Sequence, residues 1–382
     1  MSTITGFISL VKDIYGGNKI PLHEPYFTEL EKEKLDLCIE SNFVSSVGEY
    51  VNEFETVLAR FVGAKRAIAC VNGTSALHVA LHAAGVRLGD QVITQALTFV
   101  GTANAIAYTG AEPVFVDVNT TTLGMCPNAL ESWLKLNTEP TNSGAINKKN
   151  GKLISACVPM HTFGIPCDIE RLVDICKRYS IPLIEDAAES LGSYFKKKHT
   201  GTFGHLSAFS FNGNKIITTG GGGMVVTDDT DLADRLKHLT TTAKRPHTYE
   251  YVHDEVGFNY RLPNINAALG VAQMKSIDHI LERKRNVRAA YKRYFQNTSI
   301  KIIENPVDTK PNNWLNAVLF EDKNQRDEFL RVTNDLGVMT RPIWRLISEL
   351  PMYKHCETDT LERSKWLVDR VVNIPSSVPK LG

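Results

Sequence analysis

The sequence contains no long apolar run: nowhere do about eighteen apolar residues follow one another, as a membrane-spanning helix requires. Its start, MSTITGFISLVKDIYGG, has one short apolar patch and no small-residue cleavage site behind a longer one, so no secretory signal is expected. Charge of neither sign dominates, because 43 lysines and arginines face 42 aspartates and glutamates, and no long basic stretch is interleaved with aromatics. These absences argue against a membrane span and a nucleic-acid partner, and we expect a soluble, cytoplasmic protein.

Paired cysteines are also missing. The seven cysteines are an odd number, are widely scattered and include no C-x-x-C pair, which argues against a disulfide frame and against a zinc site. His78 and His82 have the i, i+4 spacing of a helical metal pair, but Val79 stands where a zinc protease would carry glutamate. We therefore expect ordinary packing of these histidines and no metal.

The 382 residues exceed the size at which single cores stop growing, so a large domain and a smaller one are expected. Short apolar runs alternate with helical stretches in the first part of the chain, and seven of them are strand candidates: RAIACVNG, QVITQALT, PVFVDV, ISACVPMHTFG, PLIEDAAES, LSAFSFN and GMVVTDD. This alternation of strand and helix segments predicts an α/β domain whose mostly parallel, seven-stranded sheet is covered on both faces by helices.

The pattern changes near residue 250. A long helical run, NINAALGVAQMKSIDHILERKRNVRAAYKRYFQ, precedes two strand-like pieces and another helix, so residues 251–382 are predicted to form a smaller α+β domain. Residues 1–250, including the N-terminal segment, are assigned to the large domain. Within it we expect a helix over residues 29–41, a second helix ending at Gly63, and a surface loop over residues 138–152.

Lys215 is the residue around which the chain is organised in this interpretation. It lies between an alternating apolar strand and four glycines, in SAFSFNGNKIITTGGGGMVV. A lysine in a cleft at a strand end can be desolvated, and an unprotonated amine is a nucleophile toward aldehydes. A solvated loop lysine beside a flexible turn has the same local sequence, so the other strand ends must decide between the two.

Four strand ends carry polar or aromatic residues, and in parallel sheets ligands gather at these ends. Gly73, Thr74 and Ser75 open a helix whose free N–H groups favour an anion, although Thr74 could equally be a simple N-cap. Glu185, Asp186 and Glu189 close an apolar run, where carboxylates need a cation or hydrogen-bond donors; helix capping by Asp186 is the alternative. Phe99 could stack on a planar ring or belong to the core. Ser210 ends the strand before Lys215.

Together these residues match what pyridoxal 5′-phosphate (PLP) requires. A helix start binds its phosphate, an aromatic side chain faces its ring, a carboxylate keeps the pyridine nitrogen protonated, and a lysine binds the aldehyde carbon.

The ordered motifs NGTSAL, TFVGTANAI, EDAAESLGS, FSFNGNK, TTGGGGM and GFNYRLPNINAALG resemble the DegT/DnrJ/EryC1/StrS family of PLP-dependent sugar aminotransferases, which have the type I aminotransferase fold. The resemblance covers nearly the whole chain. It implies that Lys215 forms the Schiff base, that Asp186 contacts the pyridine nitrogen and that Phe99 stacks on the ring. The phosphate would be held by Gly73, Thr74, Ser75 and Ser210, and by Asn259 of a neighbouring subunit, so that a homodimer is the smallest active unit.

Glu189 departs from the family pattern, because many members carry histidine or glutamine there, but it remains a candidate cofactor contact. The opening IPLHEPYF…NFVSSVGEYVNEFE resembles the LegC-like subgroup, which acts in legionaminic acid and bacillosamine-like sugar pathways. In the family the stretch matching residues 45–48 lies near the sugar. Candidate substrate contacts are Ser45, Ser46, His161 and Arg261.

The resemblance implies transfer of an amino group from L-glutamate to C4 of a nucleotide-linked 4-keto-6-deoxy-2-acetamido hexose, which we expect to be UDP-linked, for surface glycan or nonulosonic acid-type sugars. Lys215 would also move the proton in each half-reaction. Two alternatives stay open: a sugar dehydratase of the same family, whose members carry histidine in place of the lysine, and a PLP-binding regulatory protein without turnover.

Overall fold

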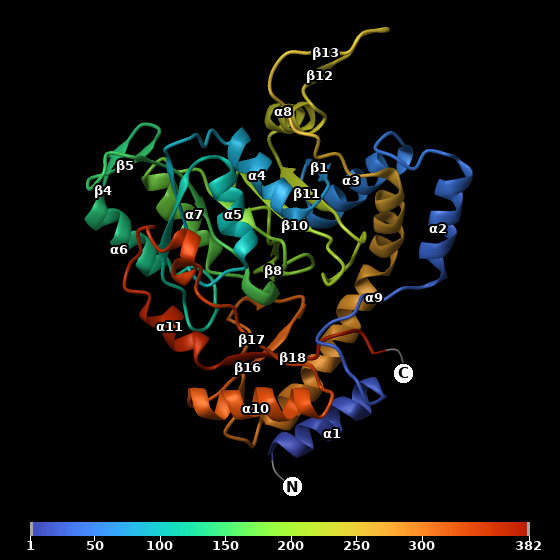
Figure 1. The fold of residues 1–382 in the computed structure, drawn as a ribbon, viewed down its shortest axis with the longest axis vertical. Coiled ribbons are helices and arrows are strands. Elements are labelled where there is room, and N and C mark those ends of the chain that lie inside the picture. Colours follow the sequence, from blue (N-terminus) through green and yellow to red (C-terminus); the bar gives the residue numbers. More distant parts are fainter. Residues whose placement is uncertain (1–2, 380–382) are drawn as a thin grey trace.

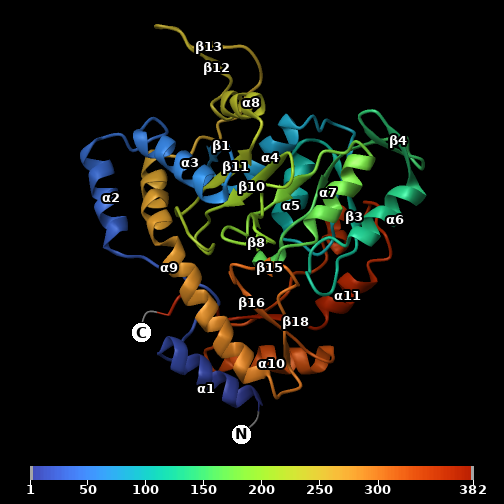
Figure 2. The ribbon, with the colours of Figure 1, turned by 180° about the vertical axis from the view of Figure 1, so that it is seen from behind.

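The computed structural model describes residues 3–379, which form a large upper body and a smaller lower part in the view of Figure 1. The upper body contains the central sheet and most helices. The lower part contains a small sheet with α1 and α10, and the long helix α9 (Asn264–Phe295) runs from one part to the other (Figures 1 and 2).

The central sheet contains the seven expected strands. Two ladders, β1-β11-β10-β7 and β6-β2-β3, are joined by parallel bridges between β6 and the β7 segment, at Cys157 with Leu183 and Met160 with Asp186. Among these seven strands, β11 alone runs antiparallel to its neighbours. The prediction of a mostly parallel seven-stranded sheet is therefore confirmed. The strands are β1 (Arg66–Cys70), β2 (Gln91–Gln95), β3 (Glu112–Val116), β6 (Leu153–Val158), β7 (Ile184–Asp186), β10 (Leu206–Ser210) and β11 (Gly223–Thr227).

Side chains alternate between the two faces of this sheet, as the period of a strand requires. In β1, Ile68 packs with one hydrophobic cluster, which includes side chains of α4, α5 and α8, whereas Ala67 and Ala69 pack with another that includes α3 and α9. A third cluster packs α6 and α7 against β2, β3 and β6. Helices thus cover both faces: α3 (Glu49–Val62), α4 (Gly73–Ala83), α5 (Val100–Tyr108), α6 (Pro127–Asn137), α7 (Ile169–Arg178) and α8 (Thr230–Thr240).

The two helices expected near the N-terminus are present. Helix α2 (Glu29–Glu40) begins with a capping box made by Thr28 and Glu31. Helix α3 ends at Gly63, whose φ of 80° is the left-handed conformation that glycine adopts readily at a helix C-terminus.

The expected loop over residues 138–152 is wrong for residues 138–147. These residues form an antiparallel hairpin of β4 (Thr138–Thr141) and β5 (Gly144–Asn147), and β5 pairs with the first residues of β6. The composition is poor for strands, but pairing with an available sheet edge overrides the local preference.

The lower part is built on a second sheet in the order β14-β16-β18-β17. Helix α1 (Thr3–Tyr15) packs against it together with α9 and α10, and the ring of Phe7 lies 5.2 Å from that of Phe329 and 5.5 Å from that of Phe295. The elements are β14 (Lys301–Ile302), β16 (Asn316–Leu319), α10 (Lys323–Asp335), β17 (Arg341–Pro342), η2 (Ile347–Glu349), η3 (Pro351–Tyr353), α11 (Glu362–Val368) and β18 (Val371–Ile374).

The division of the chain near residue 250 stays a prediction. The packing of α1 leads us to propose a different assignment for the N-terminal segment, in which α1 belongs with the C-terminal unit because its apolar face is buried there.

The remaining short elements are η1 (Thr162–Gly164), β8 (Tyr194–Phe195), β9 (Lys198–His199), β12 (Lys244–Arg245), β13 (Val252–His253) and β15 (Thr309–Lys310). Strands β12 and β13 form an arm that projects from the upper body beside α8 (Figures 1 and 2). An ion pair between Arg235 and Glu255 connects its base to α8. Within residues 3–379 no helix combines the length and apolarity needed to cross a membrane.

Candidate active site

A cavity of about 630 Å³ lies where the carboxyl ends of the central strands face the small sheet of the lower part. Its volume lies within the range of small-molecule sites. Seven of the residues expected at a cofactor site line it: Gly73, Thr74, Phe99, Asp186, Glu189, Ser210 and Lys215.

The start of α4 forms one wall of the cavity. The side chain of Asn72 caps this helix by accepting a hydrogen bond from the backbone N–H of Ser75 at 2.8 Å, so Thr74 is not the N-cap. The N–H groups of Gly73 and Thr74 belong to the first turn, which has no intrahelical acceptors. A Cβ atom on Gly73 would lie 2.7 Å from Cβ of Ser210, so only glycine lets these two segments approach so closely. The result is an anion cradle of N–H groups and hydroxyls.

Phe99 stands at the N-cap position of a second helix, α5. Its side chain is 52% exposed, which does not fit the alternative of a core phenylalanine. A Cβ atom on Gly101 would lie 3.1 Å from both the Phe99 ring and the Thr74 hydroxyl, so the ring stands beside the cradle. It offers an open apolar face to a planar ligand.

Asp186 ends β7 and is almost fully buried. Its carboxylate accepts hydrogen bonds from the Thr102 hydroxyl at 2.7 Å and from the Ala188 N–H at 3.1 Å. Burial raises the pKa of Asp186 above its ordinary value. No helix follows β7 before residue 194, so the capping alternative is wrong. A buried carboxylate in this position is suited to a cationic partner such as a protonated ring nitrogen.

Lys215 follows β10 in a tight turn and points at two other side chains. Its Nζ lies 3.3 Å from Oε1 of Glu189 and 4.1 Å from the centre of the Trp314 ring. The other oxygen of Glu189 accepts a hydrogen bond from the Phe163 N–H at 2.9 Å. Burial is the largest effect on Glu189 and raises its pKa to about 7. The lysine amine therefore faces a carboxyl group that exchanges its proton near neutral pH.

Six of the expected site residues do not line this cavity: Ser45, Ser46, Ser75, His161, Asn259 and Arg261. Ser45 lies in the exposed loop before α3, where its carbonyl accepts a hydrogen bond from the Asn264 N–H. Asn259 and Arg261 are exposed and bond to each other, Arg261 Nε donating to Asn259 Oδ1 at 2.9 Å.

The position of His161 contradicts its expected contact with substrate. The ring is fully buried behind the cavity, with Nε2 2.9 Å from Glu185 and Nδ1 accepting from the Cys167 N–H at 3.2 Å. Both ring nitrogens are thus engaged by protein groups, and the histidine supports the strand ends that carry Asp186.

The residues that the sequence reasoning missed come mainly from the lower part of the molecule. They are Thr102, Trp314, Arg341, Trp344, Arg345 and Asn373. Only Arg341 and Asn373 lie in strands, and these strands are short, whereas Thr102 lies in α5 and the other three lie in loops, so none of them gave a strand-end signal. The polar Asn373 inside the apolar run VVNI of β18 was the one visible clue.

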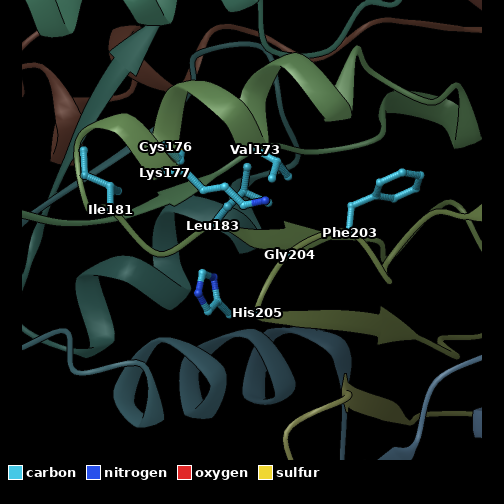
Figure 3. Close-up of a pocket in the computed structure, with 8 residues that line it drawn as sticks. All are labelled: Val173, Cys176, Lys177, Ile181, Leu183, Phe203, Gly204 and His205. Atoms are coloured by element: carbon cyan, nitrogen blue, oxygen red, sulfur yellow. The ribbon is translucent and has the colours of Figure 1, made fainter.

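A second hollow, of about 190 Å³, is separate from this site (Figure 3). It lies between α7 and the segments around β7, and none of the expected site residues lines it. Its lining is Val173, Cys176, Lys177, Ile181, Leu183, Phe203, Gly204 and His205.

Comparison with known proteins agrees with this geometry. Residues 25–381 match the model of the DegT/DnrJ/EryC1/StrS aminotransferase family. The chain belongs to this family. It is 37% identical over 359 residues to GDP-perosamine synthase of Escherichia coli O157:H7, covering 94% of this chain and 93% of the relative. GDP-perosamine synthase of Vibrio cholerae is 34% identical over 363 residues, covering 94% of each chain.

The fold agrees as well. A DegT/DnrJ/EryC1/StrS aminotransferase of Brucella abortus superposes with a TM-score of 0.83 at 27% identity, covering 93% of this chain and 91% of that one. The protein is therefore an aminotransferase of nucleotide sugars with the type I fold, and its cofactor is PLP. The expected enzyme class, fold and cofactor are confirmed. The residues present fit PLP, because an anion cradle, an open aromatic face, a buried carboxylate and a lysine surround one cavity.

Proposed function

We propose that this enzyme transfers the amino group of L-glutamate to C4 of a nucleotide-linked 4-keto-6-deoxy hexose. The observation that carries the proposal is the contact of the Lys215 amine with Glu189 and Trp314 inside a cavity that also contains Asp186. When bound, PLP supplies an electron sink that stabilises the carbanion formed at the amino carbon.

Lys215 Nζ is the group proposed to hold the cofactor covalently and then, once displaced by the donor amine, to move the proton at the reacting carbon. Glu189 Oε1 lies next to that nitrogen, so it orients the amine and can take up or release a proton near neutral pH. Asp186 is proposed to keep the pyridine nitrogen protonated, with Thr102 fixing the carboxylate in place.

The cradle of Gly73, Thr74 and Ser210 is proposed to bind the phosphate, and Phe99 to cover the ring. Ser75 stays a candidate through its place in the same helix turn. Trp314 and Trp344 add apolar walls to the cavity, and the low exposure of the lysine side chain to water favours proton transfer between the fixed groups.

We also propose a homodimer in which Asn259 reaches the phosphate site of the partner. Asn259 is exposed and does not line the cavity of its own chain, so an in-cis contact has no support. Exposed apolar side chains around Ser45 and Ser46, namely Leu37, Ile39, Phe43, Val44 and Val47, are what a subunit interface would bury. The proposed substrate contacts of Ser45, Ser46 and Arg261 would then act across that interface.

Two classes of nucleotide sugar are candidates for the acceptor substrate. The LegC-like opening motif favours a UDP-linked 2-acetamido sugar, whereas relatives named GDP-perosamine synthase favour a GDP-linked sugar as the second candidate. The test is to add L-glutamate to the yellow holoenzyme and follow loss of the cofactor absorbance and release of 2-oxoglutarate. A panel of UDP- and GDP-linked 4-keto sugars should then restore the colour with one of them. Failure of every keto sugar, with release of a sugar hydroxyl as water instead, would support the dehydratase.

A further inference from the structure

The loop that leads into β16 of the lower part contacts the active-site lysine. It contains two buried residues, Asn312 and Trp314. The indole Nε1 of Trp314 donates a hydrogen bond to the carbonyl of Asn214 at 2.6 Å, and Asn214 is the residue directly before Lys215. The centre of the same ring lies 4.1 Å from Lys215 Nζ. One tryptophan therefore contacts both the backbone in front of the lysine and the amine at the end of its side chain.

Asn312 holds the backbone of Glu189 in a similar way. Its amide Nδ2 donates hydrogen bonds to the carbonyls of Glu189 and Leu191, both at 2.8 Å. Its Oδ1 accepts a hydrogen bond from the Trp314 backbone N–H at 2.8 Å, which fixes Asn312 relative to Trp314. The side chains of Lys215 and Glu189 approach to 3.3 Å. Both members of this pair are thus supported by one short loop.

A buried lysine of α9, Lys284, anchors this loop in the lower part of the molecule. Its Nζ donates hydrogen bonds to the carbonyls of Trp314, at 3.1 Å, and Ser376, and lies 2.8 Å from His23 Nε2. Burial holds the pKa of Lys284 well below its ordinary value. A neutral amine has two N–H groups and one lone pair, which match two carbonyls and the N–H of a neutral histidine. The backbone of Trp314 is therefore held from the side opposite the lysine.

We propose that Trp314 is a positioning residue that holds the Lys215 amine in place for bonding to the cofactor and for proton transfer, while Asn312 fixes Glu189 beside it. This inference rests on the proposed function, in which Lys215 is the reacting group. An apolar wall would require only the face of the indole ring, whereas the hydrogen bond from its N–H to the Asn214 carbonyl fixes the turn that carries the lysine. Such placement matters because a displacement of about 1 Å between reacting groups can lower a rate by about a hundredfold.

The test compares the uptake of PLP by cofactor-free wild type and Trp314→Phe. Phenylalanine keeps an aromatic face but removes the N–H bonded to the Asn214 carbonyl. In the measured step the Lys215 nitrogen forms a double bond to the aldehyde carbon, and its two protons leave with the aldehyde oxygen as water. At saturating PLP we expect this step, followed by stopped-flow absorbance, to be roughly tenfold slower in the variant. Pyridoxine 5′-phosphate, which has no aldehyde, should bind both proteins with dissociation constants that agree within about threefold.

The same variant is then measured as PLP-loaded enzyme. The limiting rate of the first half-reaction with L-glutamate should fall by roughly tenfold, while the L-glutamate concentration that gives half of this rate changes by less than about threefold. Asn312→Ala, which removes the amide bonded to the Glu189 carbonyl, should slow this half-reaction in the same manner. Trp133→Phe is the matched control, because Trp133 is a buried tryptophan of α6 that does not line the cavity, and it should behave as wild type throughout. Binding of pyridoxine 5′-phosphate shows that each variant is folded.

Two results would overturn the role of Trp314. Uptake of PLP by Trp314→Phe at the wild-type rate would show that the indole N–H does not position the lysine. Loss of pyridoxine 5′-phosphate binding by the same factor as the loss of PLP uptake would make Trp314 a direct contact of the cofactor instead. If wild type takes up PLP but does not bleach with L-glutamate, the proposed function fails at its amino donor, whereas the uptake rates still decide the role of Trp314.

Discussion

Glu189→Gln should change how the stability of the cofactor-free protein depends on pH. Burial raises the pKa of Glu189 to about 7 from its ordinary 4.5, although Lys215 and the Phe163 N–H partly oppose this effect. Between these two values the folded protein holds a proton on Glu189 that the unfolded chain releases. The folded state is therefore favoured at low pH, and this contribution is lost as the pH rises through about 7. The difference between the two pKa values corresponds to about 3 kcal/mol at most.

The assay is denaturant unfolding of cofactor-free wild type and variant at intervals from pH 5 to pH 8. The free energy of unfolding of wild type, relative to the glutamine variant, should fall over this range by up to about 3 kcal/mol and level off above pH 7. Glutamine keeps the shape but cannot ionise, so the variant isolates this one group. Glu139→Gln, on the exposed strand β4, should follow wild type throughout. A constant difference between wild type and Glu189→Gln from pH 5 to pH 8 would mean that Glu189 stays ionised and the reasoning is wrong.

Borohydride reduction and peptide mapping should place the cofactor mass on Lys215; recovery on any other lysine would reject the assignment. Asp186→Asn should still bind PLP but lose turnover by roughly a hundredfold, as for removal of a preorganised charge, and near-normal turnover would mean that another group holds the ring nitrogen. Gly73→Ala should weaken PLP binding by roughly tenfold or more, because its Cβ meets the opposite wall of the cradle, whereas Gly213→Ala, with open space around it, should not. Mixing Lys215→Ala and Asn259→Ala subunits should restore part of the activity, since about half the dimers formed by random exchange contain one intact site; no gain despite formed heterodimers would place the asparagine in its own subunit.

Much of the cofactor end of the site could be predicted from the sequence. Gly73, Asp186 and Lys215 each close a strand or open a helix, and such local patterns survive in the sequence because backbone conformation and burial depend on nearby residues. Parallel strands then bring these ends to one edge of the sheet. The order of the motifs was specific enough to indicate the family and the cofactor.

Features that depend on contacts between distant segments could not be predicted from the sequence. Residues 144–147 pair as a strand because the edge of β6 was available, and residues 138–141 pair with them in turn, against their composition. His161 follows a strand as the site residues do, but its side chain turns inward to Glu185, more than twenty residues away along the chain.

The cavity wall opposite the expected cofactor residues is the clearest example of a feature that the sequence could not predict. Arg341 and Asn373 belong to short strands of a second sheet and line the cavity only after that sheet folds against the first. The fold class and the cofactor could be predicted from the sequence, because the motifs that indicate them are local patterns. The residues of the far wall depend on long-range packing that no local pattern records.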